Sequence, residues 1–476
     1  MNIFSLLKSK ITNAGAHQVF LFFALSWGLF TVFLTPPIQI SDEPNHFFRA
    51  YQISKGEYFP TAYQNRIGGF LPRSIKVVFD PFQKLFLDKT ARLKIADFKN
   101  PLDYPLNKTD TTFLSFPNTA RFIPIPYLPQ ATGIAIGRMF DAPPLVLFYL
   151  GRLVNFLVWT VLVFFALKII PVYKWLFLII ALLPMSVFEA ASLSADAFTN
   201  AISFFGIAFF LKYAFAGKTK IGNSTIVFMA LVVLMISMSK SAYFLLVLLF
   251  FLIPKDKFAT KLAYRRSAAI VLSSAIIGFI ASALFVKMVY GLHEPGTPFF
   301  LELSETLSKV DTSGQFVFIL SHPLQYSKVL LNTFWTHYPP LIQSCIGVLG
   351  WWDSIFPMYF YYLSILIFIF ITLFETTGKI NIRQKLIMAS IALATILGLA
   401  TTQYLTWTPV GKEIIDGLHG RYFIPILPLG LFLFSNQKLK AFENLIKVGA
   451  MGYVLLTAII TSYILHQRYW DFFLIL

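Results

Sequence analysis

The chain contains only one cysteine, Cys345, among its 476 residues. A single cysteine excludes an intramolecular disulfide and any metal cluster that is built from several thiolates. Charged residues are also scarce: 13% of the residues are charged and 57% are apolar, a balance that excludes an ordinary soluble protein. The composition is typical of a polytopic membrane protein.

Motifs that bind nucleotides or catalytic zinc are missing. The sequence has no Gly-rich loop ending in Lys and Ser or Thr, no GxGxxG after a strand, and no HExxH. The net charge of +17 does not indicate nucleic acid as a partner, because the Lys and Arg residues are spread over short loops between apolar runs. The basic residues therefore report orientation in a lipid bilayer.

Long apolar runs begin at residue 18 and recur almost to the end of the chain. Because a spanning helix needs about 20 apolar residues, the runs predict an all-α polytopic fold with about eleven transmembrane helices in a single membrane domain, 1–476. The runs at 224–238 and 241–253 are short enough to form a bent pair or a re-entrant element instead. The expected spans are 18–35, 145–168, 175–191, 196–211, 224–238, 241–253, 267–289, 356–374, 385–402, 422–436 and 444–465.

The distribution of basic residues predicts a cytoplasmic N-terminus. The loop that holds Lys255, Lys257, Lys261, Arg265 and Arg266 is then cytoplasmic, as are the other Lys-rich loops. Two long extracytoplasmic segments follow: residues 36–144, with short helical patterns, and residues 290–356, with an amphipathic stretch that favours the membrane interface.

Ionisable residues are concentrated directly after the first apolar run, in "SDEPNHFFRAY" (41–51). Ser41 is suited to cap a helix in which Asp42, Glu43, His46 and Arg49 share a face. The acids could simply favour a helix N-terminus, with His46 and Arg49 solvating an interfacial surface. Alternatively, they deprotonate a substrate hydroxyl or hold a divalent cation such as Mg²⁺ or Mn²⁺, and we favour this function because ionisable groups at a membrane boundary are costly.

Two further outer turns carry candidate residues. Asp196 follows Ser194 in "SLSADAF", where an N-cap with an acid in the first turn is a sufficient structural explanation and substrate binding is the alternative. Lys240 is an isolated cation between two apolar runs, which either extends toward the interface or binds an anionic head group.

The segment "GLHGRYFIPILP" (417–428) places His419, Arg421 and Tyr422 at the outer edge of the tenth expected span. The planar guanidinium of Arg421 suits a lipid phosphate, and interfacial anchoring is the alternative. Asp353 lies beside two tryptophans in "GVLGWWDSIFP", a pattern that fits an aromatic belt at the interface as well as a sugar platform.

Five motifs, "SDEPNHFFRAYQISKGE", "SLSADAFTNA", "SKSAYF", "GVLGWWDSIFP" and "HGRYFIPILP", occur in register over most of the chain. Together they resemble the bacterial DUF2142 family of predicted polytopic membrane proteins. That family in turn resembles the GT-C superfamily of glycosyltransferases, which take a sugar from a polyprenyl-phosphate carrier on the outer face of the membrane.

The resemblance implies that the protein is a glycosyltransferase of the bacterial cytoplasmic membrane. Its donor would be a polyprenyl-phosphate sugar, and its acceptor a glycan, lipid or protein. Asp42 and Glu43 occupy the place of the superfamily's loop acids, as general base or metal ligands, with His46 as an orienting partner. Lys240 and Arg421 would then contact the donor phosphate.

Other functions remain open. A transporter or flippase of lipid-linked sugars also needs outward cations, although no internal repeat is evident. An oligosaccharide polymerase or ligase would work on the same face, but the early acidic loop disfavours it. A structural membrane scaffold is a further alternative.

Overall fold

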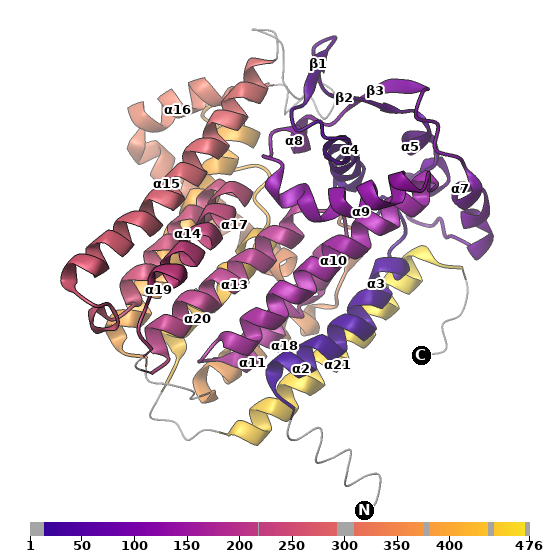
Figure 1. The fold of residues 1–476 in the computed structure, drawn as a ribbon. Helices are drawn as coiled ribbons and strands as arrows, with labels where there is room; N and C mark the ends of the chain where they lie inside the picture. Colours follow the sequence, from indigo (N-terminus) through magenta and orange to yellow (C-terminus); the bar gives the residue numbers. More distant parts are fainter. Residues whose placement is uncertain (1–13, 218, 293–308, 376–379, 437–441, 472–476) are drawn as a thin grey trace, which may run out of the picture.

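The computed structural model describes residues 14–217, 219–292, 309–375, 380–436 and 442–471. A bundle of apolar helices forms one part of the molecule, and a smaller region from residues 36–144 covers one end of it (Figure 1). The prediction of a helical membrane protein is confirmed. The N-terminus, which the sequence predicts to be cytoplasmic, lies outside the described residues.

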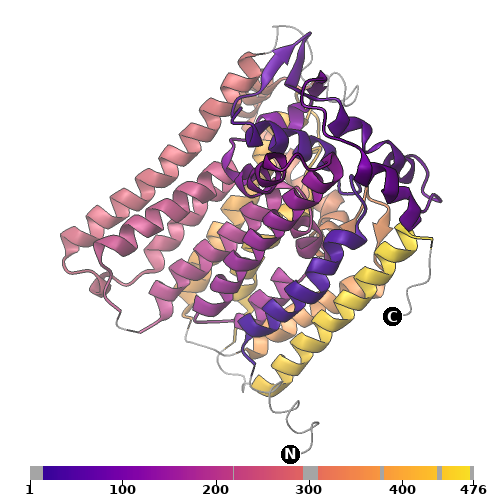
Figure 2. The same cartoon turned by 45° about the vertical axis from the view of Figure 1, so that its right-hand side comes forward.

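Among the described residues, six helices are long and apolar enough to cross a membrane. The first is a continuous helix of three parts, α2 (Ala16–Phe23), the π-helical η1 (Ala24–Gly28) and α3 (Leu29–Leu34). The other five are α10 (Pro144–Ile169), α13 (Ala195–Phe215), α15 (Lys261–Gly291), α19 (Ile382–Trp407) and α21 (Glu443–Tyr469). Figures 1 and 2 both place α21, at the end of the chain, beside α2 and α3 at its beginning.

Four shorter apolar elements lie within the bundle, so helix length alone does not establish the predicted number of about eleven spans. They are α14 (Asn223–Ser239), the 3-10 helix η4 (Ser241–Leu252), α18 (Met358–Phe374) and the segment η7–α20–η8 (Gly420–Ile426, Leu427–Leu431, Phe432–Phe434). The expected span 175–191 is broken into α11 (Lys174–Ala181) and α12 (Pro184–Ala190). The break precedes Pro184, which has no N–H to continue the helix.

Residues 36–144 form the cap over the bundle, with the short helices that the sequence predicts. They are α4 (Glu43–Ser54), α5 (Ser74–Val77), α6 (Asp80–Leu87), η2 (Ile95–Phe98), α7 (Lys99–Asp103), α8 (Pro117–Ala120), η3 (Ile125–Tyr127) and α9 (Leu128–Met139). The all-α prediction is wrong here, because β1 (Thr61–Tyr63), β2 (Arg66–Pro72) and β3 (Thr111–Ser115) form an antiparallel sheet with Gly68 opposite Ser115. Gly68 permits this pairing, since a Cβ there would lie 1.9 Å from the Leu114 carbonyl oxygen.

The segment 290–356, which the sequence predicts to be extracytoplasmic, contains two helices and a hairpin in the part from residue 309 on that the structure describes. They are α16 (Thr312–Ser321), α17 (Pro323–Ile346), and β4 (Val348–Leu349) paired with β5 (Ser354–Ile355). Along α17 the large side chains Leu324, Leu331 and Trp335 are exposed, while Val329 and Leu341 are buried. This helix is therefore two-sided, and its buried side faces the bundle.

Candidate functional site

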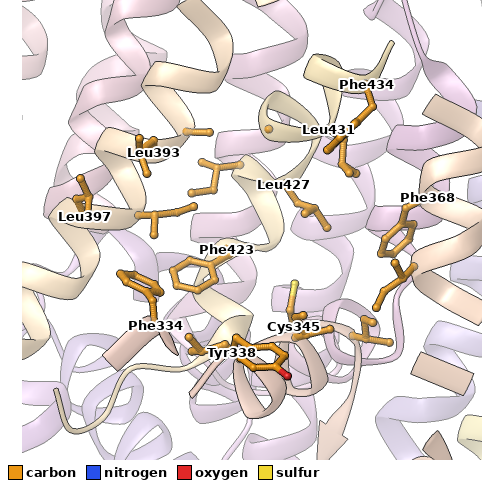
Figure 3. Close-up of a pocket in the computed structure, with 18 of the residues that line it drawn as sticks. Phe334, Tyr338, Cys345, Phe368, Leu393, Leu397, Phe423, Leu427, Leu431 and Phe434 are labelled. Carbon is orange, nitrogen blue, oxygen red and sulfur yellow. The ribbon is translucent and has the colours of Figure 1, made fainter. Parts of the chain in front are cut away.

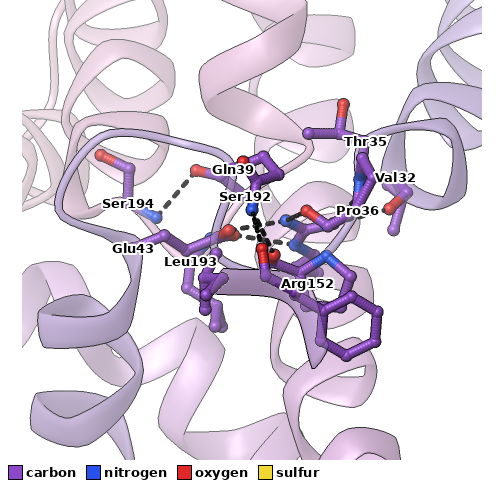
Figure 4. Close-up of polar contacts among 12 residues, drawn as sticks. Val32, Thr35, Pro36, Gln39, Glu43, Arg152, Ser192, Leu193 and Ser194 are labelled. Carbon is purple, nitrogen blue, oxygen red and sulfur yellow. Dashed lines mark hydrogen bonds and ion pairs between the residues drawn. The ribbon is translucent and has the colours of Figure 1, made fainter. Parts of the chain in front are cut away.

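A buried ion pair fixes the start of α4 to the bundle (Figure 4). Arg152 of α10 donates from Nε and Nη2 to the two carboxylate oxygens of Glu43, over 2.8 and 2.6 Å, and neither side chain is exposed. The remaining guanidinium hydrogen bonds go to backbone carbonyls at the end of the first helix: those of Val32, Thr35 and Pro36. A charge pair this deeply buried is tolerated only when its hydrogen-bonding groups are satisfied, as they are here.

The same pair also fixes the loop before α13. The backbone N–H of Leu193 donates to Glu43 Oε1 over 3.2 Å. Asn155 and Gln130 hold the neighbouring carbonyls of that loop. The predicted N-cap Ser194 is confirmed, because its hydroxyl accepts from the Asp196 N–H. Glu43 therefore connects the two segments that carry Asp42 and Asp196, and its carboxylate is fully engaged in doing so.

Asp42 lies at the entrance to α4, in the left-handed region at φ 64°. This residue, and not Ser41, is the N-cap, and the Ser41 hydroxyl donates to the Gly350 carbonyl instead. The Asn118 amide donates to Asp42 Oδ1 over 3.0 Å, and Asn118 is itself held by Asn45. A non-glycine residue at positive φ is strained, and such strain is concentrated at functional sites.

His46 lies one turn further along α4, and its Nδ1 is 2.7 Å from the hydroxyl of Tyr127. Burial lowers the pKa of His46 from 6.5 to about 4, although the Asp42 and Asp196 carboxylates oppose the shift. Burial also raises the pKa of Tyr127, so its phenol keeps its proton. His46 is therefore neutral at pH 7 and can orient a polar group without contributing charge.

Two cations, Lys240 and Arg421, lie near the carboxylates of Asp42 and Asp196. Lys240 Nζ is 2.9 Å from Asp196 Oδ1 and 3.5 Å from the ring centroid of Tyr422. Arg421 Nη1 is 2.9 Å from Glu189 Oε1, and its Nε is 4.0 Å from Asp196 Oδ2. The carboxylates of Asp42 and Asp196 are within electrostatic range of both His46 and Arg421. We name Asp42, Asp196, Lys240 and Arg421 the charged cluster; the neutral His46 lies beside it.

Close packing of backbone brings Arg421 to this position. The Gly420 N–H donates to the Ser344 hydroxyl over 2.9 Å. A Cβ on Gly420 would lie 1.7 Å from the carbonyl oxygen of Leu341, so only glycine allows η7 to approach α17 this closely. The ring of His419 lies between those of Trp352 and Tyr422, with centroids 5.2 and 5.6 Å away. Burial and the nearby Arg421 lower the pKa of His419 to about 3.

An apolar groove of about 980 Å³ lies between α17, α18, α19 and the η7–α20–η8 segment (Figure 3). Phe334, Tyr338, Phe368, Leu393 and Phe423 are among the side chains that line it. Phe423 follows Arg421 and Tyr422 in η7, and Cys345 in the groove wall follows Ser344, which holds Gly420. The groove and the cluster therefore share the contact between α17 and η7.

The structure brings seven of the predicted site residues together: Asp42, His46, Asp196, Lys240, His419, Arg421 and Tyr422. Glu43 is instead committed to Arg152. The other two predicted residues have structural partners as well. Arg49 donates to Gln52 and to the carbonyls of Tyr58 and Phe122, and Asp353 pairs with Arg468 over 2.7 Å.

The predicted divalent-cation ligands Asp42 and Glu43 do not converge on one point. Glu43 is adjacent to Asp42 in sequence, but its carboxylate is held by Arg152. Among the described residues, no group of three or more His, Cys, Asp or Glu side chains could hold a metal ion.

The family model for predicted membrane proteins, DUF2142, matches residues 25–430. The chain belongs to this family. Comparison with curated proteins and with solved structures gives no match. The charged cluster and most of the groove lie within the part that matches the DUF2142 family, whereas Leu431 and Phe434 of the groove wall and all of α21 lie beyond it.

Sequence reasoning missed four residues of this DUF2142 chain: Glu189, Arg152, Tyr127 and Asn118. Two of them could have been identified from the sequence, since Arg152 interrupts the apolar run 144–169 and Glu189 lies near the end of the run 175–191. Ionisable residues in such runs are rare and nearly always have a partner or a function. Tyr127 and Asn118 could not have been identified in this way, because their contacts depend on how the cap folds.

Proposed function

We propose that this protein is a GT-C-like membrane glycosyltransferase that moves a sugar from a polyprenyl-phosphate carrier to a glycan, lipid or protein acceptor. The observation that supports this function best is that the apolar groove and the charged cluster, with its two cations and two carboxylates, share the contact between α17 and η7. A lipid-linked sugar has the matching sequence of parts: an apolar chain, a phosphate and a polar ring. The reaction is placed on the extracytoplasmic face of the bacterial cytoplasmic membrane, where the pattern of basic loops puts the cap.

The polyprenyl chain would lie in the groove, and its phosphate would reach Arg421 and Lys240. Both cations are held in advance by carboxylates, Glu189 and Asp196, so they are oriented before the substrate arrives. Arg421 suits a phosphate because its planar fork can donate to two oxygens at once. As the sugar leaves the carrier, charge develops on the phosphate, and these cations stabilise it.

Asp42 would act as the general base. Its Oδ1 accepts from Asn118, and in the described part of the chain no hydrogen bond reaches its Oδ2. The acceptor oxygen forms a bond to the anomeric carbon, the bond from that carbon to the phosphate oxygen breaks, and the acceptor proton passes to Asp42. The polyprenyl phosphate departs with the bonding electron pair. One direct displacement inverts the configuration at the anomeric carbon.

A deletion strain tests this function. We expect it to accumulate a polyprenyl-phosphate sugar in its membranes and to lack one sugar in a surface glycan, both measured by mass spectrometry. Wild-type protein restores both. If the protein were a flippase, its deletion would instead leave the lipid-linked sugar in the inner leaflet, where an impermeant periodate reagent cannot oxidise it in intact spheroplasts. Unchanged lipids and glycans in the deletion strain would contradict the proposal.

A further inference from the structure

The turn of the β4–β5 hairpin, residues 350–353, is held on three sides. Gly350 accepts a hydrogen bond from the Ser41 hydroxyl over 3.2 Å, and the Trp351 indole donates to the Ile38 carbonyl over 3.0 Å. Asp353 accepts from Arg468 over 2.7 Å. Each contact fixes the turn against a different segment of the cap or bundle.

The side chain of Trp352, in the same turn, takes no part in these three contacts. Its backbone is in the left-handed region at φ 64°, which a bulky side chain rarely adopts. Trp352 is 46% exposed, although its ring packs against that of His419. Strained backbone that presents a large apolar ring at a polar site points to a function for that ring.

The indole borders the charged cluster. Its ring centroid is 5.2 Å from that of His419, and Trp352 lines one small hollow together with Ser41, Glu189, His419 and Arg421. A ligand resting on the exposed indole would therefore lie next to the proposed phosphate site and to Ser41, the neighbour of Asp42.

We propose that Trp352 is a stacking platform for a pyranose ring. The C–H groups on one face of a pyranose carry partial positive charge, and the face of an indole is negative, so the two surfaces are complementary. The identity of the ligand as a sugar rests on the proposed function. The platform explains why Trp352 stays exposed beside the site while the Trp351 indole is bonded to backbone.

Saturation-transfer NMR tests this proposal with the full chain in lipid nanodiscs. The probes are methyl glycosides of glucose, galactose, mannose and N-acetylglucosamine. We expect wild type to saturate the ring C–H protons of at least one probe, and Trp352→Gly to weaken its binding about tenfold. Glycine accepts the left-handed backbone without strain, so this variant should fold. Trp352→Phe should retain part of the signal.

Trp335 provides the matched control, because it is an 82% exposed tryptophan on α17 with no part in the proposed platform. Trp335→Ala should bind the glycoside as wild type does. No saturation with wild type, or equal saturation with Trp352→Gly, would overturn the proposal. So would an equal loss in Trp335→Ala, which would mean that exposed tryptophans only anchor the protein at the interface.

Competition shows whether the platform binds the sugar of the donor or that of the acceptor. If a polyprenyl-phosphate hexose displaces the glycoside but polyprenyl phosphate alone does not, the platform binds the donor sugar. If the glycoside stays bound in the presence of either lipid, the platform binds the acceptor sugar. The assay requires no transfer, so it separates this proposal from the proposed function. Glycoside binding at Trp352 together with full transfer by Asp42→Asn would contradict only the assigned base.

Discussion

Glu43 and Arg152 form a two-point ion pair in which neither side chain is exposed to solvent. The pair lies where the first helix, the start of α4 and the loop before α13 meet. It therefore fixes the distance between the segments that carry Asp42 and Asp196. An acid that looks catalytic from its position in the sequence has a positioning role in the fold.

Removing one partner of this pair should destabilise the protein strongly. Glu43→Leu leaves the buried Arg152 charge uncompensated, and Arg152→Met leaves the Glu43 charge and three backbone carbonyls without their partner, each at a cost of about 3–5 kcal/mol. The double variant Glu43→Leu, Arg152→Met should lose less than the sum of the two, because no lone charge remains. Thermal unfolding of the purified variants in detergent measures this, and strictly additive losses would show that the two residues do not act as a pair.

Arg421 should contribute to donor binding through its geometry as well as its charge. Arg421→Lys keeps the charge but loses the planar fork, so KM for the lipid-linked donor should rise roughly 10- to 100-fold. Arg73→Lys is the control, since Arg73 forms an exposed pair with Asp110 on the cap. Steady-state kinetics on proteoliposomes checks this, and an unchanged KM in Arg421→Lys would remove Arg421 from the phosphate site.

The close packing at Gly420 should not tolerate an added methyl group. Gly420→Ala places a Cβ against the Leu341 carbonyl and must push η7 away from α17, so we expect a loss of about 1–3 kcal/mol in stability and a displaced Arg421. Gly449→Ala meets open space and should unfold at the wild-type temperature. Equal melting temperatures for the two alanine variants would contradict the close approach.

Acidification should destabilise the fold through His46 and His419. Their pKa values are about 4 and about 3 in the native state, against 6.5 for an ordinary histidine, so the unfolded chain takes up protons first as the pH falls. The stability that each neutral histidine contributes is lost as the pH falls from 6.5 to about 4 for His46 and to about 3 for His419, by at most about 1.4 kcal/mol per pH unit for each histidine. Both rings are partly exposed, so the loss in free energy of unfolding should be smaller than this upper limit for each of them.

The variant His46→Gln, His419→Gln isolates this term. Its melting temperature should fall less than that of wild type between pH 7 and pH 5, since glutamine does not titrate in this range. Parallel falls in the two proteins would show that other groups determine the acid sensitivity.

Local patterns predicted much of this fold because membrane-spanning helices and helix caps depend on nearby residues. The apolar runs gave most of the bundle, and Ser194 was correctly predicted to cap α13. The small sheet of the cap was missed, since β2 and β3 pair across a separation of about 40 residues that no local period reveals. Glu43 was assigned to the site because Arg152, its partner, is more than 100 positions away. Long-range partners decide whether an ionisable residue is catalytic or structural.

The most direct test of the central claim is the transfer rate of Asp42→Asn in membranes that contain equal amounts of each variant. Donor consumption and acceptor glycosylation are followed with the lipid-linked sugar that accumulates in the deletion strain. We expect the rate to fall about 100- to 10,000-fold in Asp42→Asn at an unchanged melting temperature. The Asp110→Asn variant, which changes an exposed acid of the same cap, should transfer at the wild-type rate. Full transfer by Asp42→Asn would show that Asp42 is not the general base.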